Sequence, residues 1–193
     1  TNADNYTIKP VYGKLKVTNR SEKEKFEITV TANSVKATYD GKEHEAAGFE
    51  TTEFTVNKQK YTVSGLTTES PKKTNAGTYT NNISGTAVVK DEAGNDVTAQ
   101  FTVKTENGNL VINKRAVTMT SKSATKAYDG TALTKHEVTE TGDGFVKGEG
   151  ATYSYTGSQT LVGTSDNTFT YTLNERTNAD NYTIKPVYGK LKV

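Results

Sequence analysis

A Tyr-Asp-Gly motif is the first candidate for chemistry in this sequence. It occurs twice, as Tyr39-Asp40-Gly41 and as Tyr128-Asp129-Gly130. An aromatic ring beside a carboxylate is a common pair in sugar-binding sites, which makes the motif a candidate ligand contact. A structural role explains it better, because Asp can cap a turn, Gly can adopt a positive φ and Tyr can close the end of a β-sandwich. We therefore predict a structural turn at both positions, with both rings buried.

An acidic stretch at residues 91–96, DEAGND, has the density of carboxylates found in cation-binding loops. It lacks the ligand spacing of an EF-hand loop and lies between two apolar segments. A hairpin turn accounts for it better, and no metal site is predicted. Asp143 with Glu149 is a weaker candidate of the same kind.

The two histidines, His44 and His136, follow the two Tyr-Asp-Gly motifs at different spacings, so they form no repeated ligand set. A hydrolytic triad needs a His near a Ser or Thr with a carboxylate behind it, and the sequence near neither histidine suggests that pairing. We predict that the protein is not an enzyme, with no catalytic residue and no cofactor.

The composition argues against several other kinds of site. Without cysteine, the chain has no disulfide, no zinc site of the Cys type and no thiol nucleophile. Its 24 Lys+Arg and 22 Asp+Glu give a formal charge of +2, too balanced to favour nucleic acid or an anionic membrane as partner. No segment approaches the roughly 20 apolar residues of a membrane span, so no membrane insertion is predicted.

Lys–Asn cross-links are one way in which a cysteine-free β-sandwich can be stabilised covalently. The candidate pairs are Lys36 and Lys122, on expected first strands, with Asn178 or Asn181 on an expected last strand. Such a bond needs an apolar nest with a nearby acid, and the sequence does not favour it.

The chain contains repeats at two levels. Residues 1–17 and 177–193 read the same letters, TNADNYTIKPVYGKLKV. This identity indicates one full period of a tandem array plus the tail of a preceding copy, within a longer parent protein. Inside the period the Tyr-Asp-Gly motif recurs, preceded by ITVTA at 28–32 and by VTMTS at 117–121. The internal repeat indicates two related domains.

Domain boundaries follow from these repeats. We assign residues 1–17 to the last hairpin of the preceding copy, 18–114 to domain one and 115–193 to domain two. The joint at 113–115 is too short for one domain to fold back on the other, so we expect an elongated, end-to-end arrangement. A lone hairpin is marginally stable in water, so we expect the leading one to pack against domain one or a neighbouring molecule. Residues 18–25 are predicted to be a solvated connector rather than a helix.

The abundance of Thr, Tyr, Gly and Asn favours short strands joined by turns. Strand-like segments recur about every 8–12 residues, and Phe169, Tyr171 and Leu173 alternate with threonines. About seven short strands per domain predict an all-β protein of two immunoglobulin-like β-sandwich domains in tandem. In domain one the apolar positions change parity near residues 33–34, which predicts a bulge or a switch between sheets.

The order of these segments resembles that of a known family. A first strand, an (A/T)YDG motif, a Gly-rich middle and the closing segments NADNYTI and YGKLKV are similar to the YDG-type and MBG-like immunoglobulin-like repeats of Gram-positive bacterial surface proteins. Domain two is similar along nearly its whole length, and domain one mainly at its motif and its last two strands. The resemblance implies a wall-anchored, multi-repeat adhesin whose anchoring signal lies outside this chain, and it implies no catalytic residues.

Two functions remain open. In the first, the chain is a stalk repeat on the bacterial cell surface that holds a distal binding domain away from the wall, as a monomer whose partners are the neighbouring repeats. In the alternative, each domain pair itself binds a host glycan or matrix protein, and repetition provides avidity.

Overall fold

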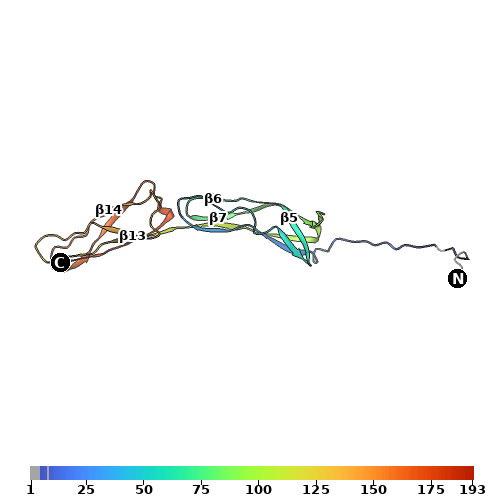
Figure 1. The fold of residues 1–193 in the computed structure, drawn as a ribbon, viewed down its shortest axis with the longest axis horizontal. Coiled ribbons are helices and arrows are strands. Elements are labelled where there is room, and N and C mark those ends of the chain that lie inside the picture. Colours follow the sequence, from blue (N-terminus) through green and yellow to red (C-terminus); the bar gives the residue numbers. More distant parts are fainter. Residues whose placement is uncertain (1–4, 8) are drawn as a thin grey trace.

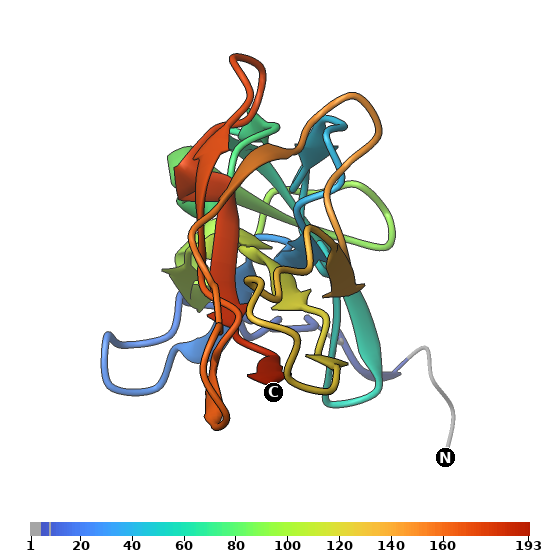
Figure 2. The ribbon, with the colours of Figure 1, turned by 90° about the vertical axis from the view of Figure 1, so that its left-hand side faces the viewer.

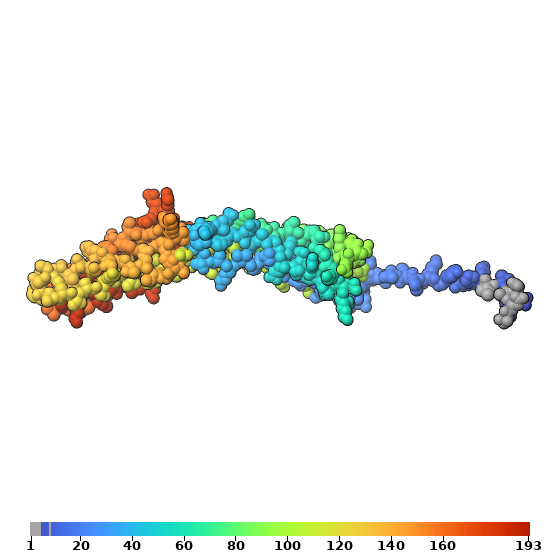
Figure 3. Space-filling model, viewed as in Figure 1, coloured from blue at the N-terminus to red at the C-terminus, as the bar shows by residue number. Residues whose placement is uncertain are grey.

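The computed structural model describes residues 5–7 and 9–193, and the regular structure of these residues is almost entirely β. Figures 1 and 3 show an elongated molecule in which an N-terminal half, residues 26–113, is followed along the long axis by a C-terminal half, residues 115–193. Viewed along that axis, the two halves overlap in projection (Figure 2). The prediction of an all-β protein is confirmed.

The N-terminal half contains ten strands and one short 3-10 helix. Its elements are β1 Phe26–Thr31, β2 Val35–Thr38, β3 His44–Glu45, β4 Glu53–Val56, β5 Gln59–Thr68, β6 Lys72–Lys73, β7 Gly77–Asn81, β8 Ile83–Asp91, η2 Thr98–Gln100, β9 Phe101–Glu106 and β10 Gly108–Asn113. They form four small sheets with the strand orders β1-β9, β2-β10-β7, β3-β6 and β4-β5-β8.

The C-terminal half contains eight strands and a second 3-10 helix. Its elements are β11 Arg115–Ser121, β12 Ala124–Thr125, β13 Val138–Gly142, β14 Ala151–Tyr155, β15 Thr164–Asp166, β16 Phe169–Leu173, η3 Ala179–Asn181, β17 Tyr182–Val187 and β18 Lys190–Lys192. The sheets have the orders β13-β11-β17, β12-β18-β15 and β14-β16.

The two halves share one plan of strand pairing. The first strand of each half runs parallel to its second-last strand, β1 with β9 and β11 with β17. The second strand runs parallel to the last, β2 with β10 and β12 with β18. In each half the last strand also pairs antiparallel with one further strand, β7 or β15. The internal sequence repeat therefore corresponds to a repeated topology.

The parity change near residue 33 reflects a switch between sheets. β1 pairs with β9 and buries the even-numbered Ile28 and Val30, whereas β2 pairs with β10. In each half a buried asparagine bonds the segment between the first two strands, where the chain changes sheets. In the N-terminal half the Asn81 Nδ2 donates to the carbonyl of Asn33 at 3.2 Å. In the C-terminal half the Asn167 Nδ2 donates to the carbonyl of Lys122 at 2.8 Å. Of the two explanations predicted, the sheet switch is the one observed.

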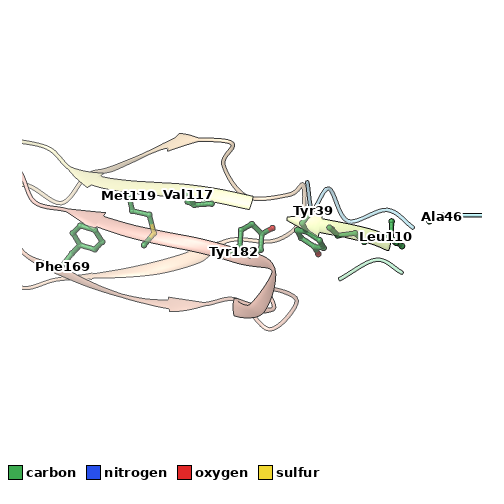
Figure 4. Packing of buried hydrophobic residues seen from close by; sticks show 8 residues of the cluster. Tyr39, Ala46, Leu110, Val117, Met119, Phe169 and Tyr182 are labelled. Carbon is green, nitrogen blue, oxygen red and sulfur yellow. The ribbon is translucent and has the colours of Figure 1, made fainter. Parts of the chain in front are cut away.

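Two hydrophobic clusters form the core. One lies in the part of the N-terminal half farther from the C-terminal half and contains Ile28, Val30, Val63, Val89 and Phe101. The other runs from one half into the other, as Figure 4 shows, and contains Tyr39, Ala46, Leu110, Ile112, Val117, Met119, Phe169 and Tyr182. The boundary between the halves thus lies inside a continuous core.

The leading segment does not pack as expected. Residues 9–17 form neither strand nor helix and are exposed, and the segment extends away from the N-terminal half (Figure 1). Leu15 is fully exposed, whereas its identical counterpart Leu191 is fully buried. The predicted packing against domain one is wrong, because this half already pairs its last strands with its own β1 and β2. Residues 1–4 and 8 of the predicted hairpin lie outside the described residues.

We expect Gly189→Ala to lower the free energy of unfolding by about 1–3 kcal/mol, since an added Cβ would lie 2.4 Å from the Ser121 carbonyl oxygen. Gly13→Ala changes the same place in the identical leading segment, meets nothing within 4 Å and should have no effect. Urea denaturation followed by circular dichroism measures both variants. An equal loss in Gly13→Ala would show that the leading segment is packed in solution.

Candidate functional site

The two Tyr-Asp-Gly motifs form the same turn. The Asp40 Oδ1 accepts from the backbone N–H of Lys42 at 3.0 Å, and the Asp129 Oδ1 accepts from that of Thr131 at 2.9 Å. The glycines Gly41 and Gly130 adopt φ values of 77° and 79°, a region that favours glycine. The turn is therefore built by the motif itself in both halves.

Hydrogen bonding lowers the pKa of both aspartates in these turns. The backbone N–H of Lys42 is the largest influence on the pKa of Asp40, with a further contribution from His44. For Asp129 the largest influence that lowers the pKa is the hydrogen bond from the Lys126 Nζ, 2.7 Å away. Both carboxylates are thus held in the charged form that caps the turn.

The tyrosine rings of the two motifs have different environments. Tyr39 is 5% exposed, whereas Tyr128 is 58% exposed. The prediction that both rings are buried is wrong for Tyr128. The C-terminal half covers Tyr39, but within the described chain nothing covers Tyr128 at the far tip of that half. Burial of the ring therefore depends on what packs against the turn and not on the motif itself.

Tyr39 belongs to a cluster at the joint between the halves. The Tyr39 Oη donates to the Glu149 Oε1 at 2.5 Å, and the Tyr182 Oη donates to the Glu149 Oε2 at 2.8 Å. The two tyrosine rings meet edge to face with centroids 5.5 Å apart (Figure 4). One carboxylate thus accepts a hydroxyl from each half.

Burial raises the pKa of both tyrosines in this cluster. For Tyr39, burial is the largest cause and the hydrogen bond to Glu149 adds to it. For Tyr182, burial is again the largest cause, and Glu149 raises the pKa further against an opposing bond from the Val146 N–H. Both hydroxyls are therefore held neutral, as donors to the carboxylate.

Two further side chains cross the joint. The Arg115 Nε donates to the carbonyl of Gly144 at 2.7 Å, its Nη2 to that of Asp143 at 2.5 Å, and its Nη1 to that of Tyr39 at 3.4 Å. Asn181 is buried; its Oδ1 accepts from the Ala76 N–H at 2.8 Å and its Nδ2 donates to the Asn75 Oδ1 at 3.0 Å. The Arg115 bonds to Gly144 and Asp143 hold its guanidinium within the C-terminal half, whereas its bond to Tyr39 and both Asn181 bonds join the two halves and restrict their rotation.

The arrangement makes a stiff connection. A single residue, Lys114, separates β10 from β11. Bending the joint would expose two aromatic rings and break the Tyr39–Glu149 hydrogen bond. A hydrogen bond to a charged group typically contributes about 1.5–3 kcal/mol. The joint brings together three residues that the sequence marked as candidates, Tyr39, Glu149 and Asn181. We therefore take the joint as the candidate functional site.

The acidic stretch at 91–96 forms a tight turn closed by its own atoms. The Asp91 Oδ1 accepts from the Asn95 N–H at 2.8 Å, and the backbones of Lys90 and Asp96 pair in antiparallel fashion across the turn. Among the described residues no group of three or more His, Asp or Glu side chains is placed to hold a metal ion.

The histidines have structural contacts. The His44 Nε2 lies 2.9 Å from the Asp40 Oδ1, and the His136 ring stacks on Tyr155 with centroids 4.9 Å apart. Three of the four residues considered for a Lys–Asn cross-link have other partners. Lys122 pairs with Glu137, and Asn181 bonds across the joint as described above. Asn178 caps η3 by accepting from the Asp180 N–H.

A groove lies away from the joint. Its volume is about 480 Å³, and it is lined by the strands β4 and β5 and by the turn after β8, with Glu53, Phe54 and Tyr61 among its residues. Tyr61 also packs edge to face on Phe101, with centroids 4.8 Å apart.

Sequence reasoning missed two of the joint residues. Glu149 was considered only as part of an acidic pair with Asp143, although it bonds Tyr39 across 110 positions of the sequence. Asn181 was considered only for a cross-link. Neither residue lies close to the joint along the sequence, so the predicted short joint gave no signal for either of them.

Comparison with protein-family models, with curated proteins and with solved structures finds no match to this chain. In the part of the chain that the structure describes, no helix has the length and hydrophobicity needed to cross a membrane.

We expect Tyr39→Phe to lower the free energy of unfolding by about 1.5–3 kcal/mol, because it removes a hydrogen bond to a partly buried carboxylate. Tyr128→Phe is the matched control, since that hydroxyl lies in the same motif but on an exposed ring, and it should have no effect. Urea denaturation of both variants measures this difference. Equal losses would show that the contact with Glu149 contributes nothing.

Alkaline pH should weaken the joint. A raised folded-state pKa means that the neutral tyrosines favour the folded protein. Their full contribution is present below the unfolded pKa of about 10 and is lost as pH rises through the higher folded pKa. Unfolding free energies measured upward from pH 8 should therefore fall more steeply above pH 10 in the natural protein than in a Tyr39→Phe/Tyr182→Phe double variant. Identical slopes would contradict this assignment.

Proposed function

We propose that this chain is a structural stalk repeat of a bacterial cell-surface adhesin, consisting of two immunoglobulin-like domains that project a distal binding domain from the cell wall. The observation that carries this proposal is the joint, where Glu149 bonds tyrosines from both halves within one continuous core. A ligand-binding domain has no need of such a connection, whereas a spacer has to keep its length under bending.

The repeats support the same function. The identity of residues 1–17 with 177–193 fits a tandem array in which copies follow one another. In such arrays each unit contacts only its neighbours, so reach increases with the number of copies. The resemblance to surface-protein repeats supports an array outside the cell, anchored through regions beyond this chain.

The alternative is that each copy binds a host glycan or matrix protein. The groove beside Phe54, Tyr61 and Glu53 is the observation that favours it, since aromatic and acidic side chains are found together in sugar sites. The Tyr61 ring is already engaged by Phe101.

Length measurements test the stalk. Three chains test this, each beginning once with residues 1–17 and continuing with one, two or three consecutive copies of residues 18–193. Their maximum dimensions in small-angle X-ray scattering should increase linearly with copy number. A coil-like increase, close to the square root of copy number, would contradict a stiff stalk.

Binding measurements test the alternative. A glycan and matrix-protein array probed with residues 1–193 should show no saturable binding. Saturable binding in the micromolar range or tighter, abolished by Tyr61→Ala, would instead favour the repeat as the adhesive element.

A further inference from the structure

We propose that the exposed Tyr128 tip of the C-terminal half is a docking surface for a second copy of this chain, and that it receives the end of that copy that contains Arg20, Phe26 and Phe101. This inference rests on the proposed stalk and specifies its second type of joint. The tip lies at the outer end of the C-terminal half, yellow in Figure 3.

The exposed tip is an apolar surface with a preformed turn. Tyr128 is 58% exposed, and Leu161 and Val162 are exposed as well. Gly163, next to Val162, exchanges two backbone hydrogen bonds with Val193, so these apolar residues lie beside the last strand. The Tyr128 turn matches the Tyr39 turn, and the C-terminal half covers the Tyr39 turn. The tip therefore has the same backbone shape as a turn that is covered at the joint.

The strand register shows which residue has to come next. At the existing joint the Tyr39 N–H donates to the carbonyl of Asn113, the residue after Ile112. In the C-terminal half the equivalent of Ile112 is Val193, because Leu110 pairs with Val35 and Leu191 pairs with Ala124. In the repeat, Val17 corresponds to Val193 and is followed by Thr18. The Thr18 carbonyl of the next copy is therefore the acceptor for the Tyr128 N–H.

Arg20 is placed to act as Arg115 does. Arg115 is the third residue after Ile112 and donates to the carbonyl of Tyr39. Arg20 is the third residue after Val17, and its guanidinium lies 4.0 Å from the centroid of the Phe26 ring. Its backbone N–H donates to the Gln100 Oε1 at 3.0 Å, which fixes it on the N-terminal half.

The longer connection does not prevent this contact. Eight residues, 18–25, separate Val17 from β1, whereas two, Asn113 and Lys114, separate the equivalent Ile112 from β11. The excess closes on itself, because the Glu24 N–H donates to the Ser21 carbonyl and the Ser21 Oγ donates to the Glu24 carboxylate. The chain thus runs from Val17 to Arg20 in three residues, and residues 21–25 form a loop before β1.

One partly exposed aromatic ring, Phe26, is present on the receiving end. Phe26 and Phe101 pack with centroids 5.6 Å apart, and they begin the strand pair equivalent to Arg115 and Tyr182. Phe101 therefore occupies the place of Tyr182, the ring on which Tyr39 packs. Phe101 itself is 5% exposed and belongs to the core of the N-terminal half, whereas Phe26, which packs on it, is half-buried. Tyr128 of one copy therefore meets the Phe26 ring and Arg20 of the next.

Hydrogen exchange in a two-copy chain tests the joint. Residues 1–193 followed directly by residues 18–193 should show amide exchange at 126–132 of the first copy slowed by about tenfold relative to the single chain. The second copy's Arg20→Ser and the first copy's Tyr128→Ala should each reverse this protection. Tyr171→Ala, on the side of β16, should leave it unchanged.

The outcomes separate this joint from the stalk itself. No added protection at 126–132, with slow exchange retained around Tyr39, overturns the docking proposal and leaves the stalk in place. Fast exchange around Tyr39 as well would overturn the stalk. Protection that survives both Tyr128→Ala and Arg20→Ser would overturn the assigned contact.

Discussion

One carboxylate determines how the two halves of this protein sit on each other. Glu149 accepts a hydroxyl from Tyr39 of the N-terminal half and from Tyr182 of its own half. A partly buried carboxylate needs such donors, because an unpaired charge away from water costs several kcal/mol. Any rotation of the joint removes at least one donor. The elongated shape therefore depends on this contact together with the apolar core beneath it.

Identical sequences behave differently in this chain according to what they can pair with. Leu191 is buried between β12 and β15, whereas Leu15, in the same seventeen-residue segment, is exposed. The Tyr-Asp-Gly turns show the same dependence at smaller scale, since Asp and Gly fix the backbone but not the burial of the ring. Local sequence determines the turn, and the neighbouring half of the chain determines whether the tyrosine is covered.

This division explains what could be predicted from the sequence. The β class, the change of parity at residue 33 and the turn at 91–96 depend on residues close together along the chain, and alternation or turn chemistry indicated them. The roles of Glu149 and Asn181 depend on partners more than 100 positions away. No periodicity indicates such pairs, and a single sequence contains no other record of them. The immunoglobulin-like description stays a prediction.

The two types of joint in an array would differ in strength for a reason visible in their residues. Tyr182 has a hydroxyl that bonds Glu149, but Phe101 at the equivalent position cannot donate a hydrogen bond. Gln100 corresponds to Asn181 and is already bonded to Asn19 on its own side. The second joint would therefore depend on aromatic packing and on Arg20, with a looped connection in place of one residue. A stalk built this way alternates stiffer and weaker joints, and bending would concentrate at one joint in every period.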